Sequence, residues 1–247
     1  MAQRIAILTQ GQTNPLSAKT AVSLLRYRSD EVVALIDSEA AGQTAQDLLQ
    51  CGGVTPIVAS LDDIPGAVSG AGADTLIIGV APPGGKLPAA MRDVVLDAAK
   101  RGLNVTAGLH QFLTDDADIR EAARHGGGLL WDVRKNDERE VADRKGIRDG
   151  CLRIHAVGQD CSCGKMVASV ELARGLQARG EDAKFVATGQ TGILVAPGVN
   201  AGVQLTEEER HDPTGGGAPI DCVTADFING ASEKLVKRNQ HHDILVI

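Results

Sequence analysis

One short stretch, from Leu152 to Leu176, limits the possible folds of this chain more than any other. Residues 152–157 are rich in aliphatic side chains, which alternate with polar side chains, and this pattern predicts a strand. Residues 167–176 space their apolar side chains at helical intervals. Between them, Gly158 to Lys165 reads Gly-x-x-x-x-Gly-Lys. A strand, such a loop and a helix in succession predict a phosphate-binding loop, in which main-chain N–H groups and the helix N-terminus converge on an anion.

One residue of this loop departs from the usual pattern. Met166 stands where a Ser or Thr hydroxyl normally binds the magnesium ion of a nucleoside triphosphate. Because a thioether is a poor ligand for so hard a cation, we expect the loop to hold a diphosphate that is not cleaved, such as that of coenzyme A. A chance Gly-Lys turn is the alternative. The residues predicted to bind this cofactor are Gly158, Cys161, Ser162, Cys163, Gly164, Lys165 and Met166.

The composition narrows the class of protein. Aromatic residues make up only 2% of the 247 residues, so the core must consist of Val, Leu, Ile and Ala, which are typical of parallel α/β layers. The net charge of −7 argues against nucleic-acid and membrane-surface binding. With no signal peptide, no membrane-spanning run and an odd number of cysteines, we expect a reduced, cytoplasmic protein, with a homo-oligomer possible. Cys161 and Cys163 lack a second Cys/His pair, so no metal is expected.

The order of the segments predicts two α/β domains. Apolar strands and helices alternate regularly up to residue 133, which predicts a Rossmann-like, doubly wound parallel sheet in residues 1–133. One of the helices expected there covers residues 61–68. Residues 134–150 mix both charges and are interpreted as a linker. Residues 151–247 then form a P-loop-like domain, in which we expect a flexible loop or lid at 196–219 and a helix carrying Asp226 in the second part of 220–235.

Several polar residues follow predicted strands, where ligands of such sheets usually bind. Lys86 lies in the Gly/Pro-rich loop after the fourth strand, and His110 follows the fifth. His110 could carry a proton, although a lone histidine is more often a hydrogen-bonded structural residue. Asp37 ends the second strand, where an NAD-binding acid would lie. The first turn lacks Gly-x-Gly-x-x-Gly, so a solvated aspartate is favoured there.

Together these segments resemble one family, the DgcN-type D-glutamate N-acetyltransferases, formerly a family of unknown function. The resemblance covers nearly the whole chain and implies a Rossmann-like domain followed by a P-loop-like domain. Two departures are the 196–219 loop, which is longer, and the end of the chain, where relatives continue with a Gly-rich segment. The segments that carry the resemblance are 18–21, 24–28, 78–82, 84–85, 108–110, 132–135, 160–162, 164–166, 185–193 and 225–227.

The resemblance implies transfer of an acetyl group from acetyl-CoA to the amino group of D-glutamate. Such a reaction needs a base for the substrate ammonium, donors for the thioester oxyanion and cations for two carboxylates. Asp160, Asp226 or His110 is the candidate base, Gln190 or Thr191 the candidate donor, and Lys86 a partner for a substrate carboxylate, with Thr188 beside them. Two alternatives remain: an ATP-dependent, carboxylate-activating ligase of the dethiobiotin synthetase type, and a non-catalytic nucleotide- or CoA-binding protein.

Overall fold

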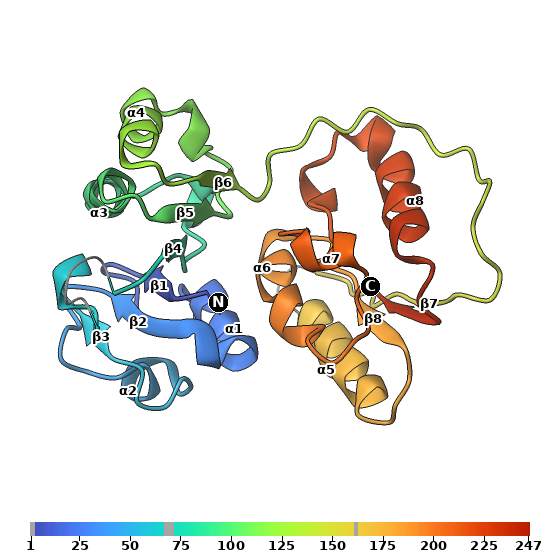
Figure 1. The fold of residues 1–247 in the computed structure, drawn as a ribbon, viewed down its shortest axis with the longest axis horizontal. Coiled ribbons are helices and arrows are strands. Elements are labelled where there is room, and N and C mark those ends of the chain that lie inside the picture. Colours follow the sequence, from blue (N-terminus) through green and yellow to red (C-terminus); the bar gives the residue numbers. More distant parts are fainter. Residues whose placement is uncertain (1–2, 67–71, 161–162) are drawn as a thin grey trace. The chain divides into compact units, whose positions relative to one another are not determined.

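The computed structural model describes residues 3–66, 72–160 and 163–247 (Figure 1). The chain divides into two compact units, Met1–Val133 and Arg134–Ile247. The boundary falls where the charge-rich segment 134–150 begins. Each unit has its own parallel sheet, so the α/β class expected from the sequence is confirmed.

The first unit is built on a six-stranded parallel sheet. Its strand order, β3-β2-β1-β4-β5-β6, is that of a doubly wound Rossmann-like fold. The central strands are buried on both faces because helices cover both sides, which explains their continuous aliphatic sequences. The strands are β1 (Ile5–Leu8), β2 (Val32–Ile36), β3 (Ile57–Val58), β4 (Thr75–Ile78), β5 (Asn104–Ala107) and β6 (Leu130–Asp132).

Four α-helices connect these strands: α1 (Lys19–Tyr27), α2 (Ala45–Leu49), α3 (Ala89–Lys100) and α4 (Ala117–Gly126). Thr44 and Asp47 cap α2 reciprocally, and the Asp116 carboxylate caps α4. The expected helix at 61–68 is wrong: the described part forms only a 3₁₀ turn, Leu61–Asp63, and Pro65-Gly66 does not continue it. Residues 67 and 68 lie outside the described part. The unit's other 3₁₀ turns are Ser29–Glu31, Pro83–Gly85 and Leu113–Asp115.

The second unit has a smaller parallel sheet in the order β7-β9-β8. Helix α5 packs against β8, β9 and α6. The strands are β7 (Leu152–Ile154), β8 (Ala183–Phe185) and β9 (Ile244–Val246). The helices are α5 (Lys165–Gln177), α6 (Gln190–Val199), α7 (Glu207–His211) and α8 (Ile228–Asn239), with 3₁₀ turns at Ile220–Cys222 and Ala225–Phe227. None of the helices in the described part of the chain combines the length and the apolar composition that crossing a bilayer requires.

Two expectations for this unit are wrong. Segment 196–219 is not a flexible loop: it includes the end of α6 and all of α7. The buried ammonium of Lys184 on β8 pairs with the buried carboxylate of Glu209 on α7, and this contact fixes the segment to the sheet. Asp226 is also not on a long helix, because it lies in the 3₁₀ turn before α8.

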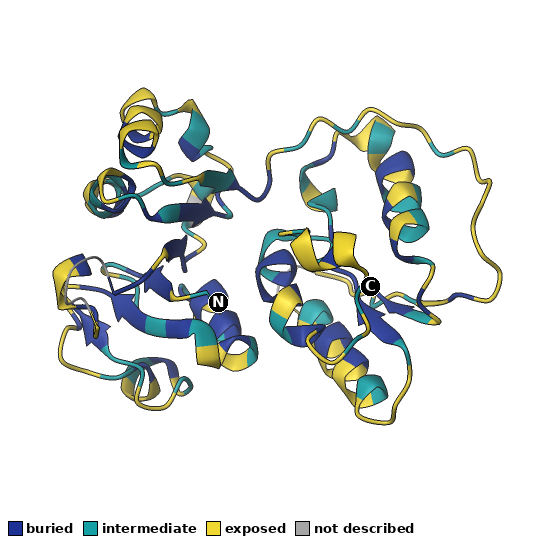
Figure 2. Ribbon diagram, viewed as in Figure 1, coloured by how far each residue is buried: buried dark blue, intermediate teal, exposed yellow. Residues whose placement is uncertain are grey.

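Segment 134–150 has no helix or strand, yet it is bonded to the rest of the second unit. The main-chain N–H groups of Asp143 and Arg144 donate to the Glu233 carboxylate on α8, and Lys234 pairs with Glu138. Gly230 allows this approach, because a Cβ there would lie 1.9 Å from the Glu140 carbonyl oxygen. Figure 2 shows the segment as mostly exposed, in contrast to the buried strands. The segment therefore covers α8 along its length.

Candidate functional site

The phosphate-binding loop predicted from the sequence joins a strand to a helix in the structure. It runs from the end of β7 to Gly164, and α5 begins at Lys165. The last residue of the chain anchors both sides: the Ile247 N–H donates to Ile154 (2.8 Å), and the Ile247 carbonyl accepts from Ser169 Oγ on α5 (3.1 Å). The start of α5 is thus held at the carboxyl edge of the three-stranded sheet, where ligands of parallel sheets bind.

The two glycines of the loop are needed for different reasons. Gly164 has a φ of +95° and precedes the first residue of α5, a conformation that side-chain-bearing residues rarely adopt. Gly158 is required by close packing, since a Cβ there would lie 2.6 Å from Cys163 Sγ and 3.1 Å from Lys165 Cγ. The loop therefore closes tightly on its own lysine and cysteine.

The Lys165 ammonium lies inside this closed loop. Its Nζ donates to the Asp160 carbonyl oxygen (2.6 Å) and lies 3.6 Å from Cys163 Sγ, and that thiol lies 3.1 Å from the same carbonyl oxygen. The contact with the main chain of Asp160, and then the nearby Lys165 charge, hold the pKa of Cys163 below its ordinary value. An entering phosphate would replace the carbonyl as the partner of the ammonium. Cys161 and Ser162, two of the predicted cofactor ligands, lie outside the described residues.

The start of α6 adds a second helix N-terminus at the same edge. Thr188 follows β8, and Gln190 and Thr191 form the first turn of α6. Because only β9 separates β7 from β8, the ends of these two strands are about 10 Å apart. The predicted carbonyl donors thus share a sheet edge with the loop. Met166, in the first turn of α5, is half-buried and offers no hydroxyl for a metal ion.

Sequence reasoning missed an arginine beside α6. Arg134 is only 8% exposed, its guanidinium pairs with Asp221, and Asp221 Oδ1 lies 3.9 Å from where a Cβ on Gly189 would be. Gly189 is the residue that precedes α6. The pairing fixes the beginning of segment 134–150 next to the predicted donors. Arg134 is one of many charged residues in the expected linker, so composition does not distinguish it. The signal in the sequence is its position in segment 132–135, which carries part of the family resemblance.

Two predicted residues, Lys86 and His110, come together in the first unit. The loop after β4 packs against the loop after β5: a Cβ on Gly85 would lie 2.5 Å from the His110 ring, and the His110 N–H donates to the Gly85 carbonyl oxygen (3.0 Å). Both side chains are exposed. The expectation that these loops share one edge is therefore confirmed, whereas their chemical roles stay predictions.

The remaining candidates differ in their surroundings. Asp37, which we weighed as a ribose ligand, is buried and accepts bonds from the Thr13 hydroxyl and the Glu39 N–H, so its carboxylate serves the local fold. Asp160 and Asp226 are exposed residues of the second unit. Asp160 follows Gly158 within the loop, and Asp226 precedes α8. The structure places Asp160, Gln190 and Thr191 at one sheet edge and leaves the choice of base open.

Comparisons with known proteins agree with this division. Residues 38–136 match the model of a domain of unknown function, DUF1611_N, described as Rossmann-like, and residues 140–247 match the DUF1611 C-terminal model, described as a P-loop domain. The D-glutamate N-acetyltransferase of Tritonibacter scottomollicae is 34% identical over 233 residues, and that of a Pseudoalteromonas species is 35% identical over 177 residues.

A solved structure is also similar. The crystal structure of a DUF1611 family protein from Anabaena variabilis superposes with a TM-score of 0.77 at 33% identity, over 99% of this chain and 65% of that one. The aligned regions of the two acetyltransferases cover 93% and 70% of this chain, but only 60% and 47% of those proteins. The chain thus spans roughly half to two thirds of the length of its relatives.

Proposed function

The chain belongs to the DUF1611 family, with its Rossmann-like and P-loop domains, and we propose that it acts in the N-acetylation of D-glutamate with acetyl-CoA as the donor. The names of the two acetyltransferases support the reaction. The observation that carries the choice of donor is the phosphate loop, in which Lys165 is present and the metal-binding hydroxyl is replaced by Met166.

The second unit holds the donor in this proposal. The Lys165 ammonium leaves the Asp160 carbonyl oxygen and binds the diphosphate of coenzyme A, assisted by the N-terminus of α5. Gly158 and Gly164 allow the close approach of the loop to Cys163 and Lys165, and Met166 follows in the first turn of α5. Cys161 and Ser162 stay predicted ligands of the cofactor. The acetyl thioester then lies toward the start of α6, where Gln190 or Thr191 donates to its carbonyl oxygen and Thr188 contacts the substrate.

The reaction balances with groups of this chain. The amino group of D-glutamate, once it has lost a proton to a base, attacks the thioester carbonyl carbon. The oxyanion that forms collapses, the C–S bond breaks, and coenzyme A leaves as a thiol after taking up a proton. Asp160, Asp226 and His110 are the candidate bases, and Lys86 is the candidate partner of a substrate carboxylate.

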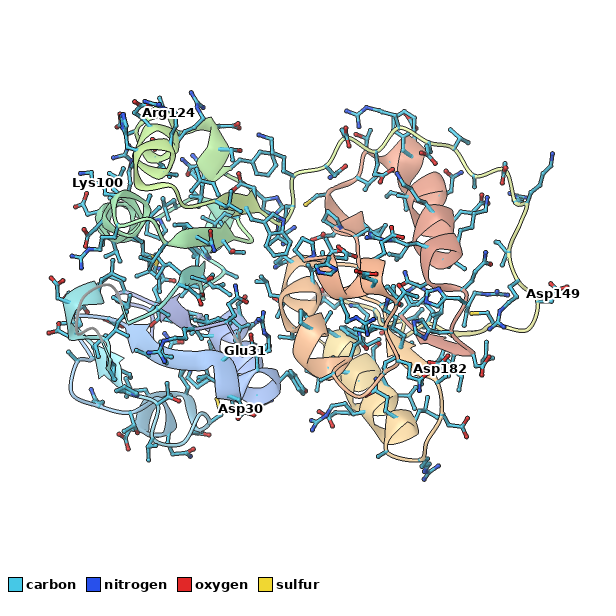
Figure 3. All side chains as sticks on the ribbon, in the orientation of Figure 1. Asp30, Glu31, Lys100, Arg124, Asp149 and Asp182 are labelled. Carbon is cyan, nitrogen blue, oxygen red and sulfur yellow. The ribbon has the colours of Figure 1, made fainter. Side chains whose placement is uncertain are left out.

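Direct assays test the donor and the acceptor separately. Isothermal titration of this chain with coenzyme A, without added metal, should give saturable binding, and Lys165→Ala should weaken it by about 10- to 100-fold, the typical value of a hydrogen bond to a charged group. Lys100→Ala, at the exposed end of α3 (Figure 3), is the matched control and should bind as the parent does. Equal losses in both variants would contradict the role of the loop.

The acceptor is tested by product analysis. Chromatography should find N-acetyl-D-glutamate when acetyl-CoA and D-glutamate are supplied, and less product from L-glutamate. His110→Gln, Asp160→Asn and Asp226→Asn then identify the base through the lowest turnover. Magnesium-dependent release of ADP from ATP in the same protein would instead favour the ligase reaction, and tight coenzyme A binding without any product would favour the non-catalytic alternative.

A further inference from the structure

We propose that Glu209, His241 and His242 form a zinc site at the amino edge of the second unit's sheet. The ligating atoms of these three side chains lie within 4.8 Å of one another. Glu209 comes from α7, and the two histidines come directly before β9. One carboxylate and two imidazoles are ligands that zinc prefers, and three protein ligands leave its fourth position to water.

Two of the distances are near those of a tetrahedral ion. Bonds of about 2.0–2.1 Å to zinc place neighbouring ligand atoms about 3.4 Å apart. Nε2 of His241 lies 3.1 Å from Glu209 Oε2, and Nε2 of His242 lies 3.1 Å from Glu209 Oε1. The two imidazole rings stack at 4.2 Å between centroids. Because the His241 side chain is 42% exposed, a small rotation of this ring completes the site without disturbing the core.

The orientation of His242 favours a cation at its Nε2 atom. This residue is 1% exposed, and its Nδ1 atom lies 2.7 Å from the Asp182 carboxylate, just before β8 (Figure 3). A carboxylate on one ring nitrogen is the usual support of a zinc-bound histidine, because it fixes the tautomer and leaves the other nitrogen to the metal. Here that other nitrogen faces Glu209. With the proton on Nδ1, the lone pair of Nε2 faces Glu209 Oε1, and a cation between these two atoms would bind both.

The carboxylates around the site outnumber the permanent cations by one. Three carboxylates meet here, those of Asp182, Glu209 and Asp212, and the permanent cations facing them are Lys184 and Arg238. Lys184 binds Glu209 Oε1. Oε2 accepts from the Thr206 N–H (2.8 Å), so a metal shared with His241 would bind the second lone pair of Oε2.

The position of the site separates the ion from the phosphate loop. In a parallel sheet the phosphate loop follows the carboxyl end of β7, whereas the histidines precede the amino end of β9. The strands are three residues long, so about 10 Å of sheet separates the two edges. The ion would join α7 to the start of β9, and it would take no part in the proposed acetyl transfer.

Zinc titration of the chain, after chelator treatment and dialysis, tests this inference. We expect one zinc ion per chain by inductively coupled plasma mass spectrometry, and a higher melting temperature with zinc but not with magnesium. His241→Gln should weaken zinc binding by about 10- to 100-fold or more while the protein stays folded, because this side chain is partly exposed. His125→Gln, at another exposed histidine beside a glutamate, is the matched control and should bind zinc as the parent does.

Three results would overturn the site: no stoichiometric zinc, full zinc binding by His241→Gln, or an equal loss in His125→Gln. Coenzyme A binding serves as an independent readout, since it should be the same with and without zinc. Failure of the acetyltransferase proposal therefore leaves this test unchanged.

Discussion

Asn200 provides a sharp test of how the second unit is held together. It is 1% exposed, its Oδ1 accepts from the Phe185 N–H, and its Nδ2 donates to the Phe185 carbonyl oxygen, both at 2.9 Å. Phe185 ends β8, an edge strand of the described sheet, and its main-chain groups face away from β9. The Asn200 amide therefore takes the place of a neighbouring strand at this residue.

Replacing Asn200 by leucine, which has a similar volume, leaves both main-chain groups of Phe185 buried without partners. Each unsatisfied group costs about 1–3 kcal/mol, so we expect a loss of about 3 kcal/mol in the free energy of unfolding. For a domain of this size, that loss lowers the melting temperature by roughly 10 °C. Asn200→Asp should also destabilise, because it turns a carboxylate oxygen toward the Phe185 carbonyl oxygen, but it keeps an acceptor for the N–H.

The assay combines guanidinium unfolding, followed by far-ultraviolet circular dichroism, with hydrogen exchange at the Phe185 amide. Exchange should accelerate strongly in Asn200→Leu and less in Asn200→Asp. Gln204→Leu, at an exposed position between α6 and α7, is the control and should change the unfolding free energy little. If Asn200→Leu lowers the free energy of unfolding by less than about 0.5 kcal/mol, the Asn200 amide does not stabilise the edge of the sheet at Phe185 as argued.

Three further predictions follow from single contacts. Iodoacetamide should alkylate Cys163 faster and at lower pH than Cys51, because the pKa of Cys163 is lowered, whereas that of Cys51 is raised chiefly by burial. Coenzyme A should slow the alkylation of Cys163 but not that of Cys51. Peptide mass spectrometry gives both rates. Asp132→Ala should lower the free energy of unfolding by about 2–4 kcal/mol, because this carboxylate accepts from the Leu113 and Thr114 N–H groups and from the Thr114 hydroxyl. Asp93→Ala, at an exposed position of α3, is the control and should change it little in the same denaturation experiment. A hydrogen bond from Lys237, followed by one from the Lys145 N–H, lowers the pKa of Asp143 from 3.8 to about 2. The ionised carboxylate therefore stabilises the folded protein above pH 3.8, and this stabilisation is lost as the pH falls toward 2. In Asp143→Asn the melting temperature should depend less on pH between 3.8 and 2 than it does in the parent, and the two proteins should show the same pH dependence above that range.

The sequence predicted most of what depends on local periodicity. Parallel strands covered on both faces carry continuous aliphatic runs, so β1, β2 and β4 were recognisable, as was the Gly-x-x-x-x-Gly-Lys loop before α5. The helix expected at 61–68 is wrong because Pro65 and Gly66 stop a helix after the 3₁₀ turn at Leu61–Asp63.

The contacts that hold the second unit depend on residues far apart in the chain. Lys184 looked like an ordinary strand residue, and its partner Glu209 lay in a segment whose glycines, prolines and charges predicted a flexible loop. Neither periodicity nor spacing reveals that these charges neutralise each other inside the protein. Arg134 and Asp221 were concealed in the same way, since a charged segment on a surface and one that anchors a turn have the same composition.

This arrangement separates the stability of the second unit from its ligand binding. The buried side chains of Lys184, Glu209 and His242 lie around β8 and at the amino end of β9, and the removal of one partner from such a cluster is strongly destabilising. Among the described residues of the loop at the opposite edge, Lys165 and Cys163 are bonded to one carbonyl oxygen, that of the exposed Asp160. Substitutions of Lys165 should therefore leave the unit folded, and a loss of coenzyme A binding in them measures the contact with phosphate itself.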